Sequence, residues 1–449
     1  MSVTSKDLTA KLNLLNGRDA KIVIVGMGYV GFPLAVAFAR EGFSVTGIDI
    51  DAVRVNRINA GVPPYDSAEY DLLIEFGTHK DRISASTFYA AVGTADVVLV
   101  AVQTPLMGEG DSRSDLSFLK NAARQIGAHM TGPTLVVLNS TVVPGTTFGP
   151  FKEALEAAYL AWNSGPVCAG RDYWLGYTPE RVTPGAALRD LQSVPRVVGA
   201  DDEDTRLLMG TLYSFLMDMH LITGATVREA ETVKVAENAL RDVEIAFANE
   251  VAVVCKELGV DVTVVRRLMN YRDDRNMLEP GAGVGGHCLT KDGLLLAQSA
   301  PHVDMPMINA ARYVNDGMPG YIYSLLRDML DKHILDDPTV VVLGVAYKPD
   351  TDDDRNSPTL ALLDILRGDG LHYRVHDPLV SPYDAALIKQ IFNDADAVVL
   401  MTAHTLYRKI HWPDVAAVMR TKIFVDGRNM IPFPSNLVDG GWEYTGVGR

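Results

Sequence analysis

The chain has 449 residues, 47% of them hydrophobic, and its 41 basic and 56 acidic residues give a formal net charge of −15. That length predicts about three domains with sizeable cores, and an acidic chain without Lys/Arg blocks argues against nucleic-acid binding. Three widely spaced cysteines without a CxxC pair argue against a disulfide framework or a zinc ribbon. We therefore expect no metal and a reducing, cytoplasmic location.

The N-terminal half predicts alternating strands and helices. Residues 1–20 form a polar lead-in without the apolar core of a signal peptide, and KIVIVGMGYVG (21–31) is a buried strand that runs into a glycine turn. A helix at 32–42 and a second strand at 43–51 complete a βαβ unit. Further strands are predicted at 95–102 and 134–141. This alternation predicts a parallel, doubly wound sheet.

The middle of the chain predicts helices. Residues 228–259 contain neither Pro nor Gly before Gly259, so they predict one long helix of about 45 Å at 1.5 Å per residue. We expect it to be a spine between domains and a dimer surface; a simple core helix is the alternative. A glycine-rich loop is predicted at 270–292, followed by helices to about 335. No apolar run reaches the roughly 18 residues of a membrane span.

A second α/β pattern begins at 339–350 and continues with strands at 371–378, 395–403 and 421–429. The predicted fold is therefore α/β, with two doubly wound Rossmann-like domains joined by a central helical domain. The second domain has only one of the glycines that a dinucleotide site needs, so we expect it to hold the nucleotide half of a substrate instead.

A cofactor site is predicted in the first domain. Gly26, Gly28 and Gly31 form G-x-G-x-x-G: the first allows a tight turn, the second admits a pyrophosphate and the third lets the helix pack on the strand. Asp49 ends the second strand, where a carboxylate binds ribose hydroxyls and repels a 2′-phosphate. NAD is therefore the expected cofactor. Arg54 is expected near the adenosine, with a surface role as the alternative.

Polar residues recur along the predicted long helix. Lys234 and Asn238 are four residues apart, and Arg241, Ile245 and Asn249 continue the stripe. An ammonium and an amide on one face can hold an alkoxide or a water beside a nicotinamide. A solvated helix face is the alternative.

Cys288 lies in an unusual glycine context, after Gly281, Gly283, Gly285 and Gly286. A thiol beside a hydride acceptor can add to an aldehyde, lose a second hydride and leave a thioester that water hydrolyses. An inert buried cysteine is the alternative. Cys168 and Cys255 lack this context and are expected to be structural.

Seven motifs in order make residues 20–435 resemble the UDP-glucose/GDP-mannose dehydrogenase family. They are GMGYVG (26–31), QTP (103–105), STVVPGTT (140–147), TPERVTPG (178–185), AETVKVAENALRDVEIAFANE (230–250), GAGVGGHCLTKD (281–292) and YKPDTDDDRNSP (347–358). The resemblance implies an NAD-binding domain at 21–205, a helical dimerisation and catalytic domain at 206–335, and a UDP-sugar-binding domain at 336–449.

The resemblance also implies roles for individual residues. Cys288 is the nucleophile, Lys234 and Asn238 hold the oxyanion or water at C6, and Glu180 is an acid/base in thioester hydrolysis. Asp292 supports that network and Thr141 orders a water. The implied cofactor-binding residues are Gly26, Gly28, Tyr29, Val30, Gly31, Asp49, Arg54, Thr104, Ser140 and Arg355. The implied substrate-binding residues are Arg241, Arg272, Gly283, Gly285, His287 and Lys348, with Arg275 competing with Arg272 for a place across the dimer.

Three motif details bear on the sugar. Pro184 replaces a second glutamate and Val284 replaces a phenylalanine of the UDP-glucose enzymes, which favours a UDP-N-acetylhexosamine, either UDP-ManNAc or UDP-GlcNAc. The Lys291–Asp292 pair is instead similar to the glucose branch, so UDP-glucose is the alternative.

Two other functions compete with a UDP-sugar 6-dehydrogenase. A two-electron β-hydroxyacid dehydrogenase would lack the thiol motif and the second α/β domain. A non-catalytic nucleotide-sugar sensor would have no need to keep Lys234, Asn238, Cys288 and Asp292 together.

Overall fold

The computed structural model describes residues 3–65, 70–108, 111–163, 165–182, 186–217, 221–333, 335–385 and 387–449. Two compact units divide the chain: unit 1 is Met1–Ala236 with Leu294–His302, and unit 2 is Glu237–Gly293 with Val303–Arg449. Within these described ranges, no helix combines the length and apolarity that crossing a membrane requires.

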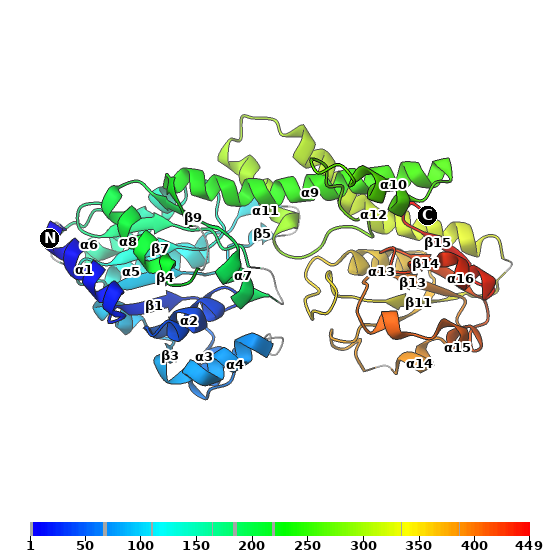
Figure 1. Cartoon of the computed structure of the whole chain (residues 1–449), viewed down its shortest axis with the longest axis horizontal. Coiled ribbons are helices and arrows are strands. Elements are labelled where there is room, and N and C mark those ends of the chain that lie inside the picture. Colours follow the sequence, from blue (N-terminus) through cyan, green and yellow to red (C-terminus); the bar gives the residue numbers. More distant parts are fainter. Residues whose placement is uncertain are drawn as a thin grey trace. The chain divides into compact units, whose positions relative to one another are not determined.

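An eight-stranded sheet forms the centre of unit 1, in the order β10-β9-β8-β7-β4-β1-β2-β3 (Figure 1). Its strands are β1 Lys21–Val25, β2 Ser44–Ile48, β3 Ile83–Ser86, β4 Val97–Val100, β7 Leu135–Leu138, β8 Trp174–Tyr177, β9 Arg196–Ala200 and β10 Leu221–Ala225. All neighbours pair in parallel except β8 and β9. A small hairpin, β5 (Leu106–Gly108) with β6 (Asp111–Ser114), stands apart from this sheet.

Alternation along β1 explains why both faces of the sheet are covered. Ile22 and Ile24 pack into one core with α2, while Val23 and Val25 pack into another with α5. Successive side chains of a strand point to opposite faces, so a continuous apolar run gives a strand that is buried on both sides. The helices of unit 1 are α1 Ser5–Gly17, α2 Gly31–Arg40, α3 Ala52–Asn59, α4 Tyr70–His79, α5 Ser117–His129, α6 Lys152–Trp162, α7 Ala187–Ser193 and α8 Glu203–Ser214.

Unit 2 contains a five-stranded parallel sheet in the order β12-β11-β13-β14-β15 (Figure 1). Its strands are β11 Thr339–Leu343, β12 His372–His376, β13 Ala397–Leu400, β14 Ile423–Asp426 and β15 Glu443–Gly446. The strand order reverses between β11 and β13, and ligands of doubly wound sheets bind outside the carboxyl ends of the strands at such a point. The helices beside it are α12 Pro306–Leu330, α13 Pro358–Gly368, α14 Ile388–Ile391, α15 Trp412–Ala416 and α16 Pro434–Asp439.

The predicted long helix is present as α9, a single 32-residue helix from Val227 to Leu258, followed by α10 (Val262–Met269). The prediction of loop up to residue 292 was wrong at its end, because α11 (Leu289–Ser299) already begins one residue after Cys288. The fold class of two doubly wound sheets with a long helix is confirmed. The domain boundaries at 205 and 335 stay a prediction.

Candidate functional site

In the turn between β1 and α2, each of the three glycines is required for a different reason. Gly26 has φ +95°, and a Cβ there would lie 2.5 Å from the carbonyl oxygen of Ala101. A Cβ on Gly31 would lie 1.8 Å from the carbonyl oxygen of Gly26. A Cβ on Gly28 meets no protein atom within 4 Å. Packing therefore requires the first and third glycines, whereas the second leaves open the space that a pyrophosphate needs.

The carboxylate of Asp49, directly after β2, is fixed in place by hydrogen bonds. It is buried, and its carboxylate accepts hydrogen bonds from the backbone N–H of Met27 (2.7 Å) and of Asp51 (3.0 Å). Arg54, at the start of α3, donates to both carboxylate oxygens at 3.1 and 3.0 Å. Its guanidinium thus fixes the carboxylate, which is a more specific role than a surface arginine would have.

Two loops that follow β4 and β7 are tied together by hydroxyl groups. Thr104 donates to the carbonyl of Thr141 at 2.6 Å, and Ser140 donates to the carbonyl of Val102 at 2.6 Å. Tyr29 is half exposed beside the ring of Tyr65 (centroids 4.5 Å apart). These residues and Val30, the residue before α2, lie beyond the carboxyl ends of parallel strands, where a dinucleotide binds in doubly wound sheets.

The donor set at this edge fits a dinucleotide. No side chain caps the N-terminus of α2, so the positive end of its helix dipole can bind a phosphate. Asp49 offers a carboxylate for a ribose, and Gly28 leaves the approach open.

Glu180 forms a buried ion pair that the sequence did not reveal. The carboxylate accepts from the backbone N–H of Arg181 (2.8 Å) and of Val182 (3.1 Å), and from Nη2 of Arg196 at 3.1 Å. Both charged side chains are buried. The guanidinium also lies over the ring of Tyr213, 4.9 Å from its centroid. These contacts fix the orientation of the Glu180 carboxylate. Pro184 lies outside the described residues.

The thiol of Cys288 lies at the beginning of α11. Its backbone carbonyl accepts from the N–H groups of Lys291 (3.1 Å) and Asp292 (2.9 Å), and the residue is exposed. A helix N-terminus favours the thiolate, the form that is nucleophilic. Cys255, in contrast, is buried, and burial raises the pKa of its thiol. Cys168 is half-buried, and none of the three cysteines forms a disulfide.

Asp292 links the thiol helix to α9. It is fully buried, and its two oxygens accept from Nδ2 of Asn238 and Nζ of Lys291, each at 2.6 Å. The predicted partnership of Asn238 and Asp292 is therefore a direct hydrogen bond. Lys234, one turn earlier on α9, is half-buried.

The rest of the α9 stripe has mixed roles. Arg241 is exposed, whereas Asn249 is fully buried and accepts from the N–H of Gly281 at 2.8 Å. Asn249 therefore positions the start of the glycine-rich segment. Arg272 and Arg275 are exposed and share one carboxylate, that of Asp274.

The glycines before Cys288 accommodate the protein's own side chains. A Cβ on Gly286 would lie 2.8 Å from Cζ of Tyr347, and one on Gly285 would lie 2.6 Å from Cβ of Tyr347. A Cβ on Gly281 would lie 2.7 Å from Nη1 of Arg428. Gly283 has φ +112° and approaches the carbonyl of Asn315. These glycines therefore allow close packing against the bulky side chains of Tyr347 and Arg428.

His287 is kept neutral beside the thiol. Burial, followed by the nearby charges of Lys291 and Arg355, lowers the pKa of His287 from 6.5 to about 4. At neutral pH the ring can therefore donate or accept a hydrogen bond but carries no charge.

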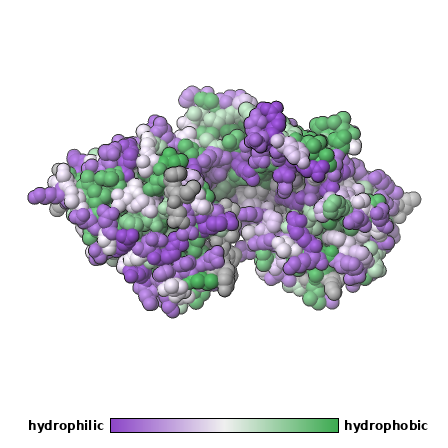
Figure 2. All heavy atoms as spheres, in the orientation of Figure 1, coloured by the Kyte–Doolittle hydropathy of each residue, from purple (hydrophilic) through white to green (hydrophobic). Residues whose placement is uncertain are grey.

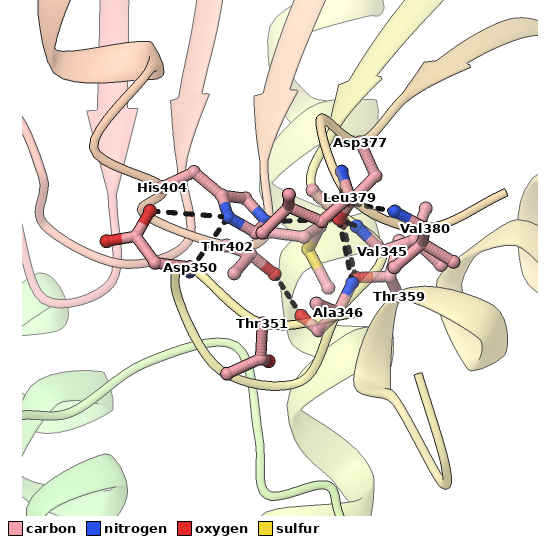
Figure 3. A network of polar contacts seen from close by, with 12 residues as sticks. Val345, Ala346, Asp350, Thr351, Thr359, Asp377, Leu379, Val380, Thr402 and His404 are labelled. Carbon is pink, nitrogen blue, oxygen red and sulfur yellow. Dashed lines mark hydrogen bonds and ion pairs between the residues drawn. The ribbon is translucent and has the colours of Figure 1, made fainter. Parts of the chain in front are cut away.

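The loop after β11 carries Lys348 and Arg355. Arg355 forms a two-bond ion pair with Asp353 (Nε–Oδ1 2.8 Å, Nη2–Oδ2 2.6 Å), and its carbonyl accepts from the N–H of Gly286 at 2.8 Å. Lys348 is half-buried between two anchored segments of the loop. Asp377 and His404 form these anchors (Figure 3).

Arg428, two residues after the end of β14, is a candidate site residue that sequence reasoning missed. Burial lowers the pKa of its guanidinium to about 10, so it stays charged at neutral pH. Nε donates to the carbonyl of Met401 at 2.8 Å. Among the residues that the structure describes, no carboxylate lies within ion-pair distance of the guanidinium. A half-buried cation without a counter-ion at the carboxyl end of a sheet suits an anionic ligand.

The chain matches known proteins over most of its length. Residues 20–217, 228–317 and 341–432 match the NAD binding, central and UDP binding domains of the UDP-glucose/GDP-mannose dehydrogenase family. The UDP-N-acetyl-D-mannosamine dehydrogenase of Pyrococcus horikoshii is 35% identical over 96% of this chain and 99% of its own length.

Solved structures show the same fold. The P. horikoshii UDP-D-ManNAc dehydrogenase structure superposes with a TM-score of 0.88 at 33% identity, covering 96% of this chain and 99% of that one. A UDP-glucose dehydrogenase from Pyrobaculum islandicum gives a TM-score of 0.81 at 31% identity, over 92% and 95% of the two chains.

Proposed function

The chain belongs to the UDP-glucose/GDP-mannose dehydrogenase family, and we propose that it oxidises the C6 alcohol of a UDP-N-acetylhexosamine, UDP-N-acetylmannosamine above all, to the carboxylate. The observation that carries the proposal is the exposed thiol of Cys288 at the start of α11, with Asp292 of the same helix bonded to Asn238. This pairing of a nucleophile with an amide network is what a four-electron oxidation requires.

The first oxidation converts the C6 alcohol to an aldehyde. NAD⁺, when bound, would supply the hydride acceptor, one molecule for each of the two oxidations, and the proton of the C6 hydroxyl leaves to solvent. Lys234 and Asn238 stabilise the oxyanion on the C6 oxygen, with Asp292 orienting the Asn238 amide. Thr141 is proposed to order a water near this oxygen.

The second oxidation uses the thiol. Cys288 Sγ adds to the aldehyde carbon to form a thiohemiacetal, which loses the second hydride and becomes a thioester. Glu180, held in place by Arg196, takes a proton from the water that attacks the thioester. Hydrolysis releases the carboxylate and regenerates the thiol.

Two cations of unit 2 are proposed to bind the nucleotide part of the substrate. Lys348 lies in the loop after β11 and Arg428 follows β14, both at the carboxyl end of the five-stranded sheet. A diphosphate would supply a counter-ion for the half-buried guanidinium of Arg428. Arg355 is proposed for the NAD pyrophosphate, and Arg241, Arg272 and His287 for the sugar.

The sugar assignment follows the relatives and the motifs. The 35% identical full-length relative is a UDP-N-acetyl-D-mannosamine dehydrogenase, and Val284 stands where UDP-glucose enzymes have Phe. UDP-glucose is the second candidate, because the Lys291–Asp292 pair is a buried ion pair of 2.6 Å and is typical of that branch.

A homodimer is proposed from the surface of α9. Leu240, Phe247 and Val254 recur every seven residues and are 59%, 51% and 55% exposed. Seven residues are nearly two helical turns, so these side chains form one apolar stripe of the kind that packs against another helix. Hydrophobic atoms also gather around α10 in Figure 2, where Val264 and Leu268 are exposed.

The proposed location is the cytoplasm, where thiols stay reduced, and the proposed role of the product is in polysaccharide biosynthesis.

The test is NADH formation with UDP-ManNAc, UDP-GlcNAc and UDP-glucose in parallel. The proposal expects the highest kcat/KM with UDP-ManNAc. A preference for UDP-glucose would move the chain to the second candidate, and no NADH from any of the three would contradict the proposed activity.

A further inference from the structure

The loop Val345–Asp350 is anchored at both of its ends by one pair of buried side chains. Asp377 follows β12 and His404 follows β13, and both side chains are fully buried (Figure 3). Lys348, the residue proposed above for the nucleotide, lies between the two anchored ends. The position of the Lys348 backbone therefore depends on this pair.

The first anchor is Asp377. Its Oδ2 accepts from the N–H groups of Val345 (2.6 Å) and Ala346 (2.9 Å), and its Oδ1 from those of Leu379 (2.9 Å) and Val380 (3.0 Å). Burial alone would raise its pKa, but the hydrogen bonds from His404 and these amides lower the pKa of Asp377 far below its usual range. The anchor is thus a permanent carboxylate.

The second anchor is His404, and its partners fix its tautomer. The backbone N–H of Asp350 can only donate, so Nδ1 of His404, 3.0 Å away, is the acceptor. The proton is therefore on Nε2, which donates to Oδ2 of Asp377 at 3.0 Å. One neutral ring bridges the carboxylate at the beginning of the loop to the amide at its end.

The left-handed backbone of Asp350 shows that this end is held in place. Asp350 has φ +59°, which is unfavourable for a residue with a Cβ. Its carboxylate accepts from the N–H (2.9 Å) and the hydroxyl (2.6 Å) of Thr405, next to His404. The turn after β13 therefore fixes Asp350 through both its backbone and its side chain.

The anchored loop also reaches the thiol segment. Tyr347 packs so closely against Gly285 and Gly286 that a Cβ on either glycine would clash with it. A shift of the loop would therefore displace the two glycines that precede His287 and Cys288.

We propose that the Asp377–His404 pair is a positioning latch for the nucleotide part of the substrate: it sets the loop that carries Lys348 and Tyr347, and neither side chain touches the reacting atoms. This inference rests on the proposed function, since it assigns Lys348 to the nucleotide.

Two substitutions of His404 test its hydrogen bonds to Asp350 and to Asp377 separately. His404→Asn keeps an acceptor near the Nδ1 position for the Asp350 N–H, whereas His404→Gln keeps a donor near Nε2 for Asp377 and loses that acceptor. UDP binding to the full chain, measured by calorimetry, should weaken about tenfold or more in His404→Gln and much less in His404→Asn. KM for the UDP-sugar should rise in parallel, with a smaller change in kcat and unchanged NAD⁺ affinity.

The matched control is His376→Gln, because His376 is a buried histidine on the same sheet whose Nδ1 bonds Tyr407 and not the loop. It should lower stability but keep UDP affinity. Thr405→Val, at an exposed position, tests the same end of the loop without a core change and should weaken UDP binding by about threefold.

Wild-type UDP affinity in His404→Gln, or equal losses in His376→Gln, would overturn the latch. Failure of the wild-type chain to bind UDP would instead overturn the proposed function, and the latch with it.

Discussion

At the residue scale, the chemistry depends on Cys288. Replacing it with serine removes the nucleophile that captures the aldehyde but leaves the glycine turn and Asp49 intact. Cys288→Ser should therefore bind NAD⁺ normally and stop after the first oxidation, with at most one NADH per sugar in a single-turnover assay. Steady-state formation of the acid at the wild-type rate would exclude a covalent role for the thiol.

The neighbouring histidine gives a pH prediction. His287 ordinarily titrates near 6.5, but burial and then Lys291 and Arg355 lower its pKa to about 4. Because the folded chain prefers the neutral ring, the stabilising contribution of His287 is present above about pH 6.5 and is lost as the pH falls toward 4.

Histidine-labelled NMR checks this directly. The His287 ring signal, assigned by its loss in His287→Gln, should stay constant from pH 8 to pH 5. A midpoint near 6.5 for His287 would contradict the buried environment.

Residues were predictable from the sequence where a motif marks them. The acceptor role of Asp49 follows from its place after a glycine turn and a second strand, and the structure adds the bonds from Met27 and Arg54. Arg196 and Arg428 were missed because nothing in the sequence distinguishes a buried arginine from a surface one. Their roles depend on neighbours far away in the chain, Glu180 and Gly281.

At the element scale, the β1–α2 turn allows a matched pair of substitutions. Gly31→Ala places a Cβ 1.8 Å from the Gly26 carbonyl oxygen, so it should lower the free energy of unfolding by at least about 1–3 kcal/mol. Gly28→Ala meets no protein atom, so it should fold normally and lose NAD⁺ affinity by about tenfold or more.

Thermal unfolding and NAD⁺ titration distinguish the two variants. Full NAD⁺ affinity in Gly28→Ala would show that the open space at Gly28 has no role in binding the cofactor.

Strands and helices with a strong hydrophobic pattern were predicted from the sequence, whereas those with a weak pattern were not. Apolar runs such as Val97–Val100 predicted their strands. Ile83–Ser86 is only four residues long and half polar, and β8 and β9 lie within residues 151–200, a mixed region rich in Gly and Pro. β10 lies within residues 201–269, where the sequence predicts helices, so that prediction was wrong there. These strands depend on pairing with distant neighbours. α11 was missed at Leu289 because its first residues follow a run of glycines that indicates a loop.

At the scale of the whole molecule, a substitution in the apolar stripe on α9 tests the proposed homodimer. Phe247→Asp places a charge in the middle of the stripe, so it should convert a dimer into single chains, measured by light scattering during size-exclusion chromatography. Phe433→Asp is the control, since Phe433 is also exposed (67%) but precedes α16 and is not part of the α9 stripe. A wild-type mass of one chain would contradict the homodimer.

The central claim is a four-electron oxidation of one sugar, and the number of NADH molecules formed per sugar tests it most directly. With limiting UDP-ManNAc and excess NAD⁺, the absorbance of NADH at completion should correspond to two NADH for each sugar consumed. A yield of one NADH per sugar would make the enzyme a two-electron dehydrogenase, and it would contradict the thioester step that Cys288 and Glu180 are proposed to carry out.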